Sequence, residues 1–476
     1  MYQNSEVRLN CSCYNRRDTE NDCRKGDFIM DLNKIKEQRV QIIMQFACPS
    51  IIAMILTAFI NIVDGFFIGN YVGTAGLAAV NLGLPIVYLY LAVGLMIAVG
   101  GISLAGRQLG AGNTDIANQV FRQTVFLCII ISFLLTAVMC FVLQPVAGLF
   151  TKDVLTLGYF EEYYGILIFE LPLMIMVSAL GMFIRGEGRP VFVMLTSIAA
   201  VLLNTLFDYI FAVPLSLGVS GIAWASFLAE LIVLGISILY LVLRPQAFRF
   251  GKFHFEKNVI REIFFNGSSE CIGELSMCIS MAAYNYQILR HAGVDGLAAF
   301  TIIGYVSYVF SMIIVGFGQG IVPLISFSFG AQERKLAANV RNTTMKLVTG
   351  AAVLIFLIMT LISGWYCRIF SDSITVVQMV IPGLRMQMSS FAFAGINTIA
   401  SFYFTAIGKA KESAVISASR GLVVLLAAIM ILPVLFGING VWCVSLTTEA
   451  ATLLLSMVYM KRESVRTIEP DAYDIS

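Results

Sequence analysis

Seven acidic side chains interrupt long apolar stretches of the sequence. They are Asp64, Glu170, Asp208, Glu230, Glu270, Glu274 and Glu449. A charged group exposed to lipid is costly, so acids in such stretches face a protein interior and mark sites that bind or move ions. The sequence therefore predicts ion-binding or proton-transfer chemistry within a membrane.

Among these acids, Asp64 and Asp208 are the pair that most specifically indicates an ion-binding site. At about 1.5 Å of rise per residue they lie roughly 6 and 8 Å below the outer boundary of their apolar stretches, and Ser226 lies roughly 10 Å below its own. Asn204 precedes Asp208 by one helical turn and shares its face. Two carboxylates, one amide and one hydroxyl can thus converge.

This group suits two chemistries. Close carboxylates in a low dielectric resist double ionisation, so one of them can hold a proton. The same oxygens also suit sodium, by extension from other hard cations. A static pair satisfied by neighbouring hydroxyls is the alternative.

A second set of charged residues lies mostly in the other half of the chain. Glu270 and Glu274 stand one turn apart, and Arg385 is expected to reach Glu274 from a neighbouring span. These residues form either a second coupling site or a structural ion pair. Glu170, close to the kink expected at Pro172, is a candidate to meet a cationic substrate.

The composition is that of a polytopic membrane protein. Of 476 residues 58% are hydrophobic and 13% charged, whereas soluble proteins have about 25% charged residues. A soluble enzyme is thereby excluded. The net charge of +2 does not indicate a nucleic-acid partner. The sequence has no Gly-x-x-x-x-Gly-Lys-Ser/Thr phosphate-binding loop, so we do not expect ATP to power the protein directly. Cys11, Cys13 and Cys23 lack a second cluster and a nearby histidine, so we expect free thiols, no metal and no cofactor.

Twelve apolar stretches are long enough to cross a membrane as helices. The predicted spans are 40–68, 76–106, 119–143, 160–184, 191–213, 219–243, 263–289, 296–326, 344–366, 377–405, 413–436 and 438–460. The predicted fold is therefore all-α. A tail (1–39) precedes the first six-helix bundle (40–243), a basic linker (244–262) joins it to the second bundle (263–460), and a tail (461–476) follows.

The distribution of basic residues predicts the orientation. Of the 31 basic residues, only Lys152, Arg290 and Arg368 fall on the side opposite the termini, and Arg385 falls inside a span. All others, Arg420 among them, are assigned to the side of the termini. By the positive-inside rule both termini are cytoplasmic, and we expect a multi-pass protein of the cell membrane.

The two halves are repeats of each other. A shift of 220 residues places Gly73-x-x-Gly76-Leu-Ala-Ala on Gly293-x-x-Gly296-Leu-Ala-Ala and Tyr88 on Tyr308. Because each half has six spans, the halves insert with one orientation and are related by a pseudo-twofold axis along the membrane normal. Asp64 maps to Tyr284 and Asp208 to Ala428, which favours a functional role over an architectural one.

These motifs resemble those of the multidrug and toxic compound extrusion (MATE) family. The resemblance rests on Pro49 with the run Asn61–Asn70, on Gly110-Ala-Gly-Asn113, and on Asn204-x-x-x-Asp208. It implies that Asp64, Asn204, Asp208 and Ser226 form a cation site, and that the first helix bends at Pro49 on protonation. The sequence departs from the family at Tyr209, where a proline is common.

The resemblance implies a secondary antiporter that expels cationic, amphipathic compounds in exchange for protons or sodium. We expect a monomer whose partners are small-molecule substrates, organic cations among them, and membrane lipid. The alternative is a flippase or exporter of a lipid-linked or other amphipathic metabolite. That function predicts several cationic residues in the cavity, and Arg385 is the only base assigned to a span. An intramembrane enzyme would need a nucleophile–base set, and the predicted spans contain no histidine to supply one. A symmetric channel would not explain why these acids are confined to one half of the repeat.

Overall fold

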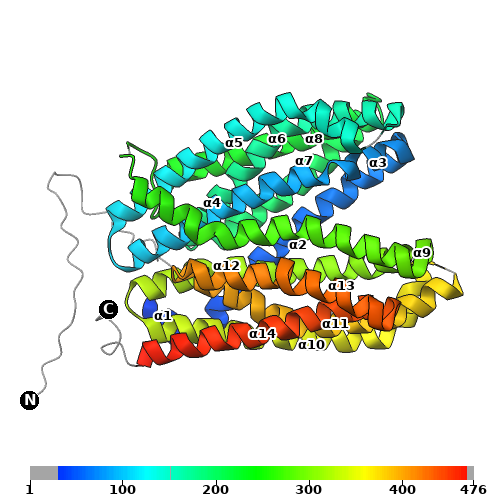
Figure 1. The fold of residues 1–476 in the computed structure, drawn as a ribbon. Helices are drawn as coiled ribbons and strands as arrows, with labels where there is room; N and C mark the ends of the chain where they lie inside the picture. Colours follow the sequence, from blue (N-terminus) through cyan, green and yellow to red (C-terminus); the bar gives the residue numbers. More distant parts are fainter. Residues whose placement is uncertain (1–29, 151, 253, 372, 469–476) are drawn as a thin grey trace, which may run out of the picture.

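The computed structural model describes residues 30–150, 152–252, 254–371 and 373–468, and within these ranges its regular secondary structure is helical (Figure 1). Cys11, Cys13 and Cys23 lie outside the described residues. The N-terminal half (N half) contains α1 (Leu32–Glu37), α2 (Arg39–Tyr71), α3 (Thr74–Leu82), α4 (Leu84–Gly110), α5 (Thr114–Phe150), α6 (Val154–Gly186), α7 (Pro190–Ala212) and α8 (Gly218–Leu243). The C-terminal half (C half) contains α9 (Lys257–Gly330), α10 (Arg334–Phe370), α11 (Ile374–Ala406), α12 (Ala410–Ala418), a π-helical turn η1 (Ser419–Val423), α13 (Val424–Phe436) and α14 (Ile438–Ile468).

The described helices account for twelve membrane crossings. Ten helical segments are long and apolar enough to cross a membrane. One of them, α9, has 74 residues and turns at Gly293, where φ is 61°, so it crosses twice. The 33-residue helix α11 provides the remaining crossing. The prediction of an all-α protein with twelve crossings in two halves is confirmed.

Most observed helices are longer than the predicted spans, and the predicted span 413–436 consists of α12, η1 and α13. Two further differences concern where helices break or begin. The span 76–106 consists of α3 and α4, which meet at Gly83. A Cβ on Gly83 would overlap the ring of Tyr164, whose hydroxyl donates to the Val80 carbonyl (2.7 Å), and Pro85 opens the next helix. In addition, α9 begins at Lys257, inside the predicted linker 244–262.

Helices α2, α4 and α9 form the contact between the two halves (Figure 1). In Figure 1 α5–α8 lie above this contact and α10–α14 below it. Helix α1 and the last turns of α14 lie on the same side of the molecule, which we call the terminal side; the opposite side is the far side. The upper and lower layers diverge toward the far side.

Glycines bring the backbones of the two halves together near the terminal side. A Cβ on Gly267 of α9 would overlap the Met96 carbonyl of α4, and a Cβ on Gly330 would overlap the Arg107 carbonyl. Overlaps of the same kind would occur at Gly100, Gly110, Gly316 and Gly320. Gly65 and Gly304, farther from the terminal side, have nothing within 4 Å of such a Cβ. The halves are therefore held together on the terminal side, by an interface that we call the glycine seam.

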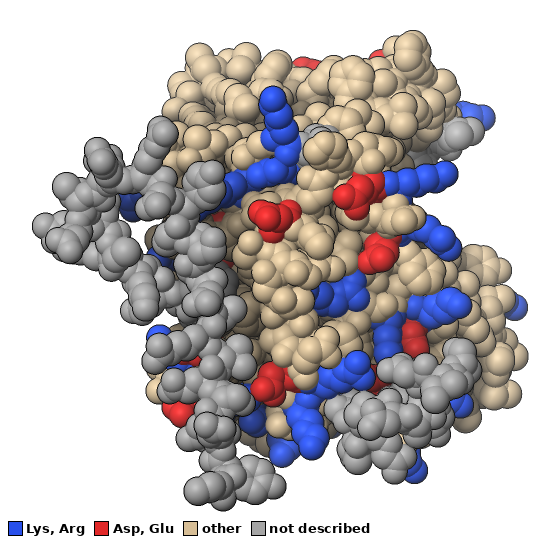
Figure 2. Space-filling view, turned by 90° about the vertical axis from the view of Figure 1, so that its left-hand side faces the viewer, with Lys and Arg blue, Asp and Glu red and all other residues tan. Residues whose placement is uncertain are grey.

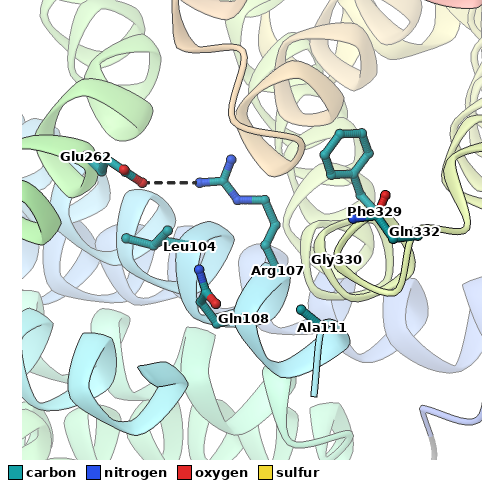
Figure 3. A pocket seen from close by; sticks show the side chains of 8 residues that line it. All are labelled: Leu104, Arg107, Gln108, Ala111, Glu262, Phe329, Gly330 and Gln332. Carbon is teal, nitrogen blue, oxygen red and sulfur yellow. Dashed lines mark ion pairs between the residues drawn. The ribbon is translucent and has the colours of Figure 1, made fainter. Parts of the chain in front are cut away.

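A pocket of about 300 Å³ opens beside the glycine seam (Figure 3). It is lined by Leu104, Arg107, Gln108, Ala111, Glu262, Phe329, Gly330 and Gln332. Arg107 of the N half points toward Glu262 of the C half, with 3.9 Å between Nη2 and Oε2. None of the predicted site residues lines this pocket, so its position marks the seam rather than the predicted chemistry.

The chain segment that joins the halves is fastened to the N half. One carboxylate oxygen of Glu187 accepts hydrogen bonds from the backbone N–H groups of Gln246, Ala247 and Phe248, at 3.1, 2.9 and 2.7 Å. Burial raises the pKa of Glu187, and these three N–H groups oppose the shift. Arg122 of α5 donates to two further carbonyls of the segment.

We expect substitution of a seam glycine to destabilise the protein. Gly267→Ala should lower the free energy of unfolding by about 1–3 kcal/mol, because the added methyl group must displace the backbone of α4. The control is Gly273→Ala on the same helix, where a Cβ has nothing within 4 Å; it should be neutral or stabilise by up to about 1 kcal/mol. Thermal unfolding in detergent, followed by tryptophan fluorescence, checks both. Equal melting temperatures would contradict the seam's role.

Candidate functional site

The structure brings Asp64, Asn204, Asp208 and Ser226 together inside the N half. Asp64 comes from α2, Asn204 and Asp208 from α7, and Ser226 from α8. The Ser226 hydroxyl donates to Asp64 Oδ2 at 3.4 Å, and Asn204 Nδ2 donates to Ser226 Oγ at 3.2 Å. The Asp208 carboxyl group lies beside that of Asp64. Asp208 is fully buried and Asp64 is 8% exposed.

Several oxygen atoms of this group have no hydrogen-bond donor. Both carboxylate oxygens of Asp208, Oδ1 of Asp64 and Oδ1 of Asn204 are buried and unsatisfied among the described residues. Leaving buried acceptors unsatisfied is costly. A proton shared between the two carboxyl groups, or a small cation among these oxygens, would remove that cost. The arrangement can therefore hold either ion.

Glu170 and Glu230 extend this acidic region. Glu170 of α6 interacts electrostatically with Glu230 of α8 and with Asp64, and both glutamates are half-buried. Glu170 thus faces the acids of the N half. This position fits a negatively charged interior that needs protons or cations for balance.

Glu270 and Glu274 have different surroundings although they are one turn apart on α9. Glu274 interacts electrostatically with Tyr88 of α4 and Tyr308 of α9, so it lies between the two halves. Glu270 lies beside Ser269, with 3.5 Å between Oε1 and Oγ, and within electrostatic reach of Arg420. The two acids can therefore serve separate purposes.

Arg385 does not pair with Glu274 in this conformation. No ion pair joins the two side chains among the described residues, and Arg385 is exposed. Its neighbour Leu384 and Met388, one turn on, are buried, so the inward face of α11 passes through those positions.

Arg420 is a base within the membrane that the sequence analysis placed on the side of the termini. It lies in the π-helical turn η1, ten residues into a membrane-spanning segment that begins at Ala410. Its Nε and Nη2 atoms donate to Glu449 Oε1 at 3.0 and 2.8 Å, and Nη1 donates to Thr398 Oγ1 at 2.7 Å. Asn397 Nδ2 holds the other carboxylate oxygen at 2.8 Å. The sequence signal that could have predicted the Arg420–Glu449 ion pair is the presence of an arginine inside the apolar stretch 413–436.

The ion pair distinguishes the two halves. Glu449 and Glu230 occupy equivalent positions of the repeat, which suggests a shared packing role, but Arg420 corresponds to Ala200 in the N half. Glu449 has a fixed cation as partner, whereas Glu230 lies near another acid, Glu170. The C half carries a built-in cation where the N half gathers carboxylates.

We expect Arg420 and Glu449 to be energetically coupled. Each alanine substitution should cost about 2 kcal/mol of stability, less than the 3–5 kcal/mol of a fully buried pair, because the Arg420 side chain is 27% exposed. A double-mutant cycle of thermal stabilities should give a coupling energy of about 1–2 kcal/mol. Lys36 and Glu333, 2.7 Å apart but 45% and 37% exposed, are the control pair and should couple by less than about 1 kcal/mol. Additive effects at Arg420 and Glu449 would refute the prediction.

Comparison with known proteins shows the family. The sequence model of the MatE family matches residues 49–210 and 271–434. The chain is 24% identical over 424 residues to the multidrug export protein MepA of Staphylococcus saprophyticus, which covers 88% of this chain and 93% of that protein.

Two solved structures are similar at 20% sequence identity. One is an outward-facing conformation of a multidrug resistance MATE family transporter of the MOP superfamily, with a TM-score of 0.85 over 89% of this chain and 96% of the other. The second is a MATE in a bent conformation, with a TM-score of 0.84 over 92% and 98%. The family match covers most of both six-helix halves, and the similar structures share the fold, so this chain belongs to the MatE family.

Proposed function

We propose that this protein is a secondary active antiporter that expels cationic, amphipathic compounds in exchange for protons or sodium by alternating access. The observation that carries the proposal is the buried Asp64–Asp208 pair, whose oxygens lack donors and would be satisfied by a proton or a small cation. Membership of the MatE family and the similarity to a multidrug export protein support the direction and the substrate class.

Antiport requires that the ion and the substrate favour different states of one equilibrium. In the proposed cycle the ion binds at Asp64 and Asp208 while the halves are closed by the glycine seam, and this disfavours the substrate-bound state. Bending of α2 at Pro49 is the proposed movement; in this conformation α2 runs through Pro49 without interruption. The seam then separates, the ion leaves and a new substrate enters.

The proposed orientation puts the terminal side in the cytoplasm of a cell whose plasma membrane the protein spans. Basic side chains are spread over the terminal face, with fewer acidic ones among them (Figure 2). This distribution agrees with the positive-inside rule. The closed seam then faces the cytoplasm, and the conformation corresponds to an outward-facing state.

The region around Glu274 is the proposed place for the organic cation. Tyr88 and Tyr308 come from equivalent positions of the two halves and both interact with Glu274. Aromatic rings and a carboxylate together attract a desolvated cation. A site contributed by both halves would also be altered whenever the halves move apart.

We expect Asp208→Asn to abolish ion-driven transport. In proteoliposomes, wild-type protein should move ethidium under an imposed proton gradient or sodium gradient, and the variant should move it at least about a hundredfold more slowly because the amide cannot take up a proton. The control is Glu162→Gln, an exposed acid whose carboxylate accepts a hydrogen bond from Ser220. It should transport at the wild-type rate.

Other outcomes of this experiment redirect the proposal. Gradient-driven transport that survives Asp208→Asn would place coupling at Glu270 or Glu274. No ethidium movement by wild type under either gradient would contradict multidrug antiport and favour the flippase.

We expect Glu274→Gln to weaken binding of a monovalent organic cation. The dissociation constant of ethidium, measured by fluorescence in detergent without any gradient, should rise about tenfold because the neutral amide no longer balances the charge of the cation. Tyr88→Leu should weaken binding about threefold or more, whereas Tyr88→Phe retains the ring and should bind like wild type. An unchanged dissociation constant in Glu274→Gln would place the cation elsewhere.

A further inference from the structure

A continuous row of buried hydroxyl groups begins next to Glu270 inside the C half. The first link joins Glu270 Oε1 to Ser269 Oγ at 3.5 Å. Ser269 Oγ lies 3.0 Å from Thr405 Oγ1, which lies 2.8 Å from Ser413 Oγ. The three hydroxyl residues are at most 1% exposed. They come from α9, α11 and α12, so the row is a tertiary arrangement and not a pattern within one helix.

The row leads toward the terminal side. Thr405 is the second-last residue of α11, and Ser413 lies one turn into α12, with its N–H bonded to the Lys409 carbonyl. Lys409 forms an ion pair with Glu463, and its side chain is 24% exposed. The row thus leads from an acid in the membrane to Ser413, whose backbone lies next to this charged pair in the first turn of α12 and whose hydroxyl donates to the Ser401 carbonyl at 2.9 Å.

A branch leaves the row at Ser413. Ser401 Oγ lies 2.8 Å from Ser413 Oγ and 3.1 Å from Ser417 Oγ. Because Ser417 is one turn farther from the terminal side than Ser413, this branch runs back into the half and ends there. It provides a hydroxyl of similar environment that does not lie between Glu270 and Lys409.

The repeat shows that the row is not inherited packing. The positions of the N half that correspond to Ser269, Thr405 and Ser413 are occupied by Pro49, Arg185 and Val193. None of these side chains carries a hydroxyl group. The same helix crossings therefore pack without the row, and polar groups retained inside a membrane protein are normally functional.

We propose that Ser269, Thr405 and Ser413 form a proton relay between Glu270 and the terminal side of the C half. A proton leaves the Glu270 carboxyl group for Ser269 Oγ, the Ser269 proton passes to Thr405 and the Thr405 proton to Ser413. Ser413 is buried in this conformation, so it releases its own proton to a water molecule that enters from the terminal side when the hydroxyl turns away from the Ser401 carbonyl. One proton is moved, Glu270 is left as a carboxylate, and each hydroxyl is restored by rotation. This inference rests on the proton form of the proposed antiport, with Glu270 as a second proton carrier beside the Asp64–Asp208 pair.

The first link acts as the gate of the relay. A relay connected in every conformation would leak protons and abolish coupling. The distance of 3.5 Å between Glu270 and Ser269 is the longest in the row and is too long for a good O–H···O hydrogen bond, whereas the following links are 3.0 and 2.8 Å. In this conformation the acid is therefore separated from an otherwise connected row, and a rotamer change of the Glu270 or Ser269 side chain would close the gap.

The test uses the full-length protein in proteoliposomes loaded with a pH-sensitive dye, with ethidium as the exchanged substrate. Thr405→Val keeps the shape of the side chain and removes the hydroxyl; it should slow proton release at least about tenfold. The dissociation constant of ethidium for this variant should stay within twofold of the wild-type value. Thr405→Ser should restore the rate, and Ser417→Ala, on the side branch, should leave it unchanged. Wild type should also slow in deuterated water, and Thr405→Val should lose that isotope effect.

A role in packing alone predicts a different pattern, because interhelical hydroxyl bonds also stabilise membrane helices. Thr405→Val would then lower the melting temperature without slowing proton release. Ser413→Ala is the second variant if Thr405→Val does not fold. Wild-type proton release in either folded variant overturns the relay and leaves the proposed antiport standing. Transport by wild type that is driven by sodium with no proton movement overturns the proton form and the relay together.

Discussion

The close approach of two backbones at the glycine seam is the constraint on which the remaining structure depends. Within lipid there is no hydrophobic drive to press helices together, so close packing of small residues must supply the attraction. At Gly267 and Gly330 the approach leaves no room even for a methyl group. Helix α9 is fixed against α4 in this way, and α9 carries Glu270, Glu274 and the ring of Tyr308. The geometry of the central region therefore follows from residues that have no side chain.

The duplicated architecture carries two different charge arrangements. The interior of the N half gathers carboxylates around Asp64 and Asp208, whose oxygens lack donors among the described residues. The interior of the C half pairs Glu449 with its own cation, Arg420, and is rich in hydroxyls, while Glu270 and Glu274 lie on α9. One scaffold thus carries, in one half, a group of carboxylates with unsatisfied oxygens among the described residues and, in the other half, an acid paired with a fixed arginine. In the proposed antiport this difference would give the two halves separate tasks in a single conformational cycle.

The sequence was sufficient for the number of crossings, the two halves and the meeting of Asp64 with Asp208, because hydropathy, repeat and depth along a helix determine these features. It was insufficient for ion pairs between helices: Arg385 does not pair with Glu274 among the described residues. Arg420 was assigned to the wrong region because an arginine near a helix end usually reaches toward the surface. Only the positions of Glu449 and Asn397 show that it is held inside. The break at Gly83 depends on Tyr164, which is remote in sequence.

The attachment of the connecting segment by Glu187 and Arg122 has a mechanical consequence. The fastening continues to the last residue before α9, since the N–H of Glu256 donates to Gln123 of α5 at 3.1 Å. These hydrogen bonds shorten the free length of the joint between the halves and hold the start of α9 beside α5 in this conformation. A separation on the terminal side that keeps these hydrogen bonds would be a rotation about this point, and the opening would be widest at the edge of the interface most distant from it.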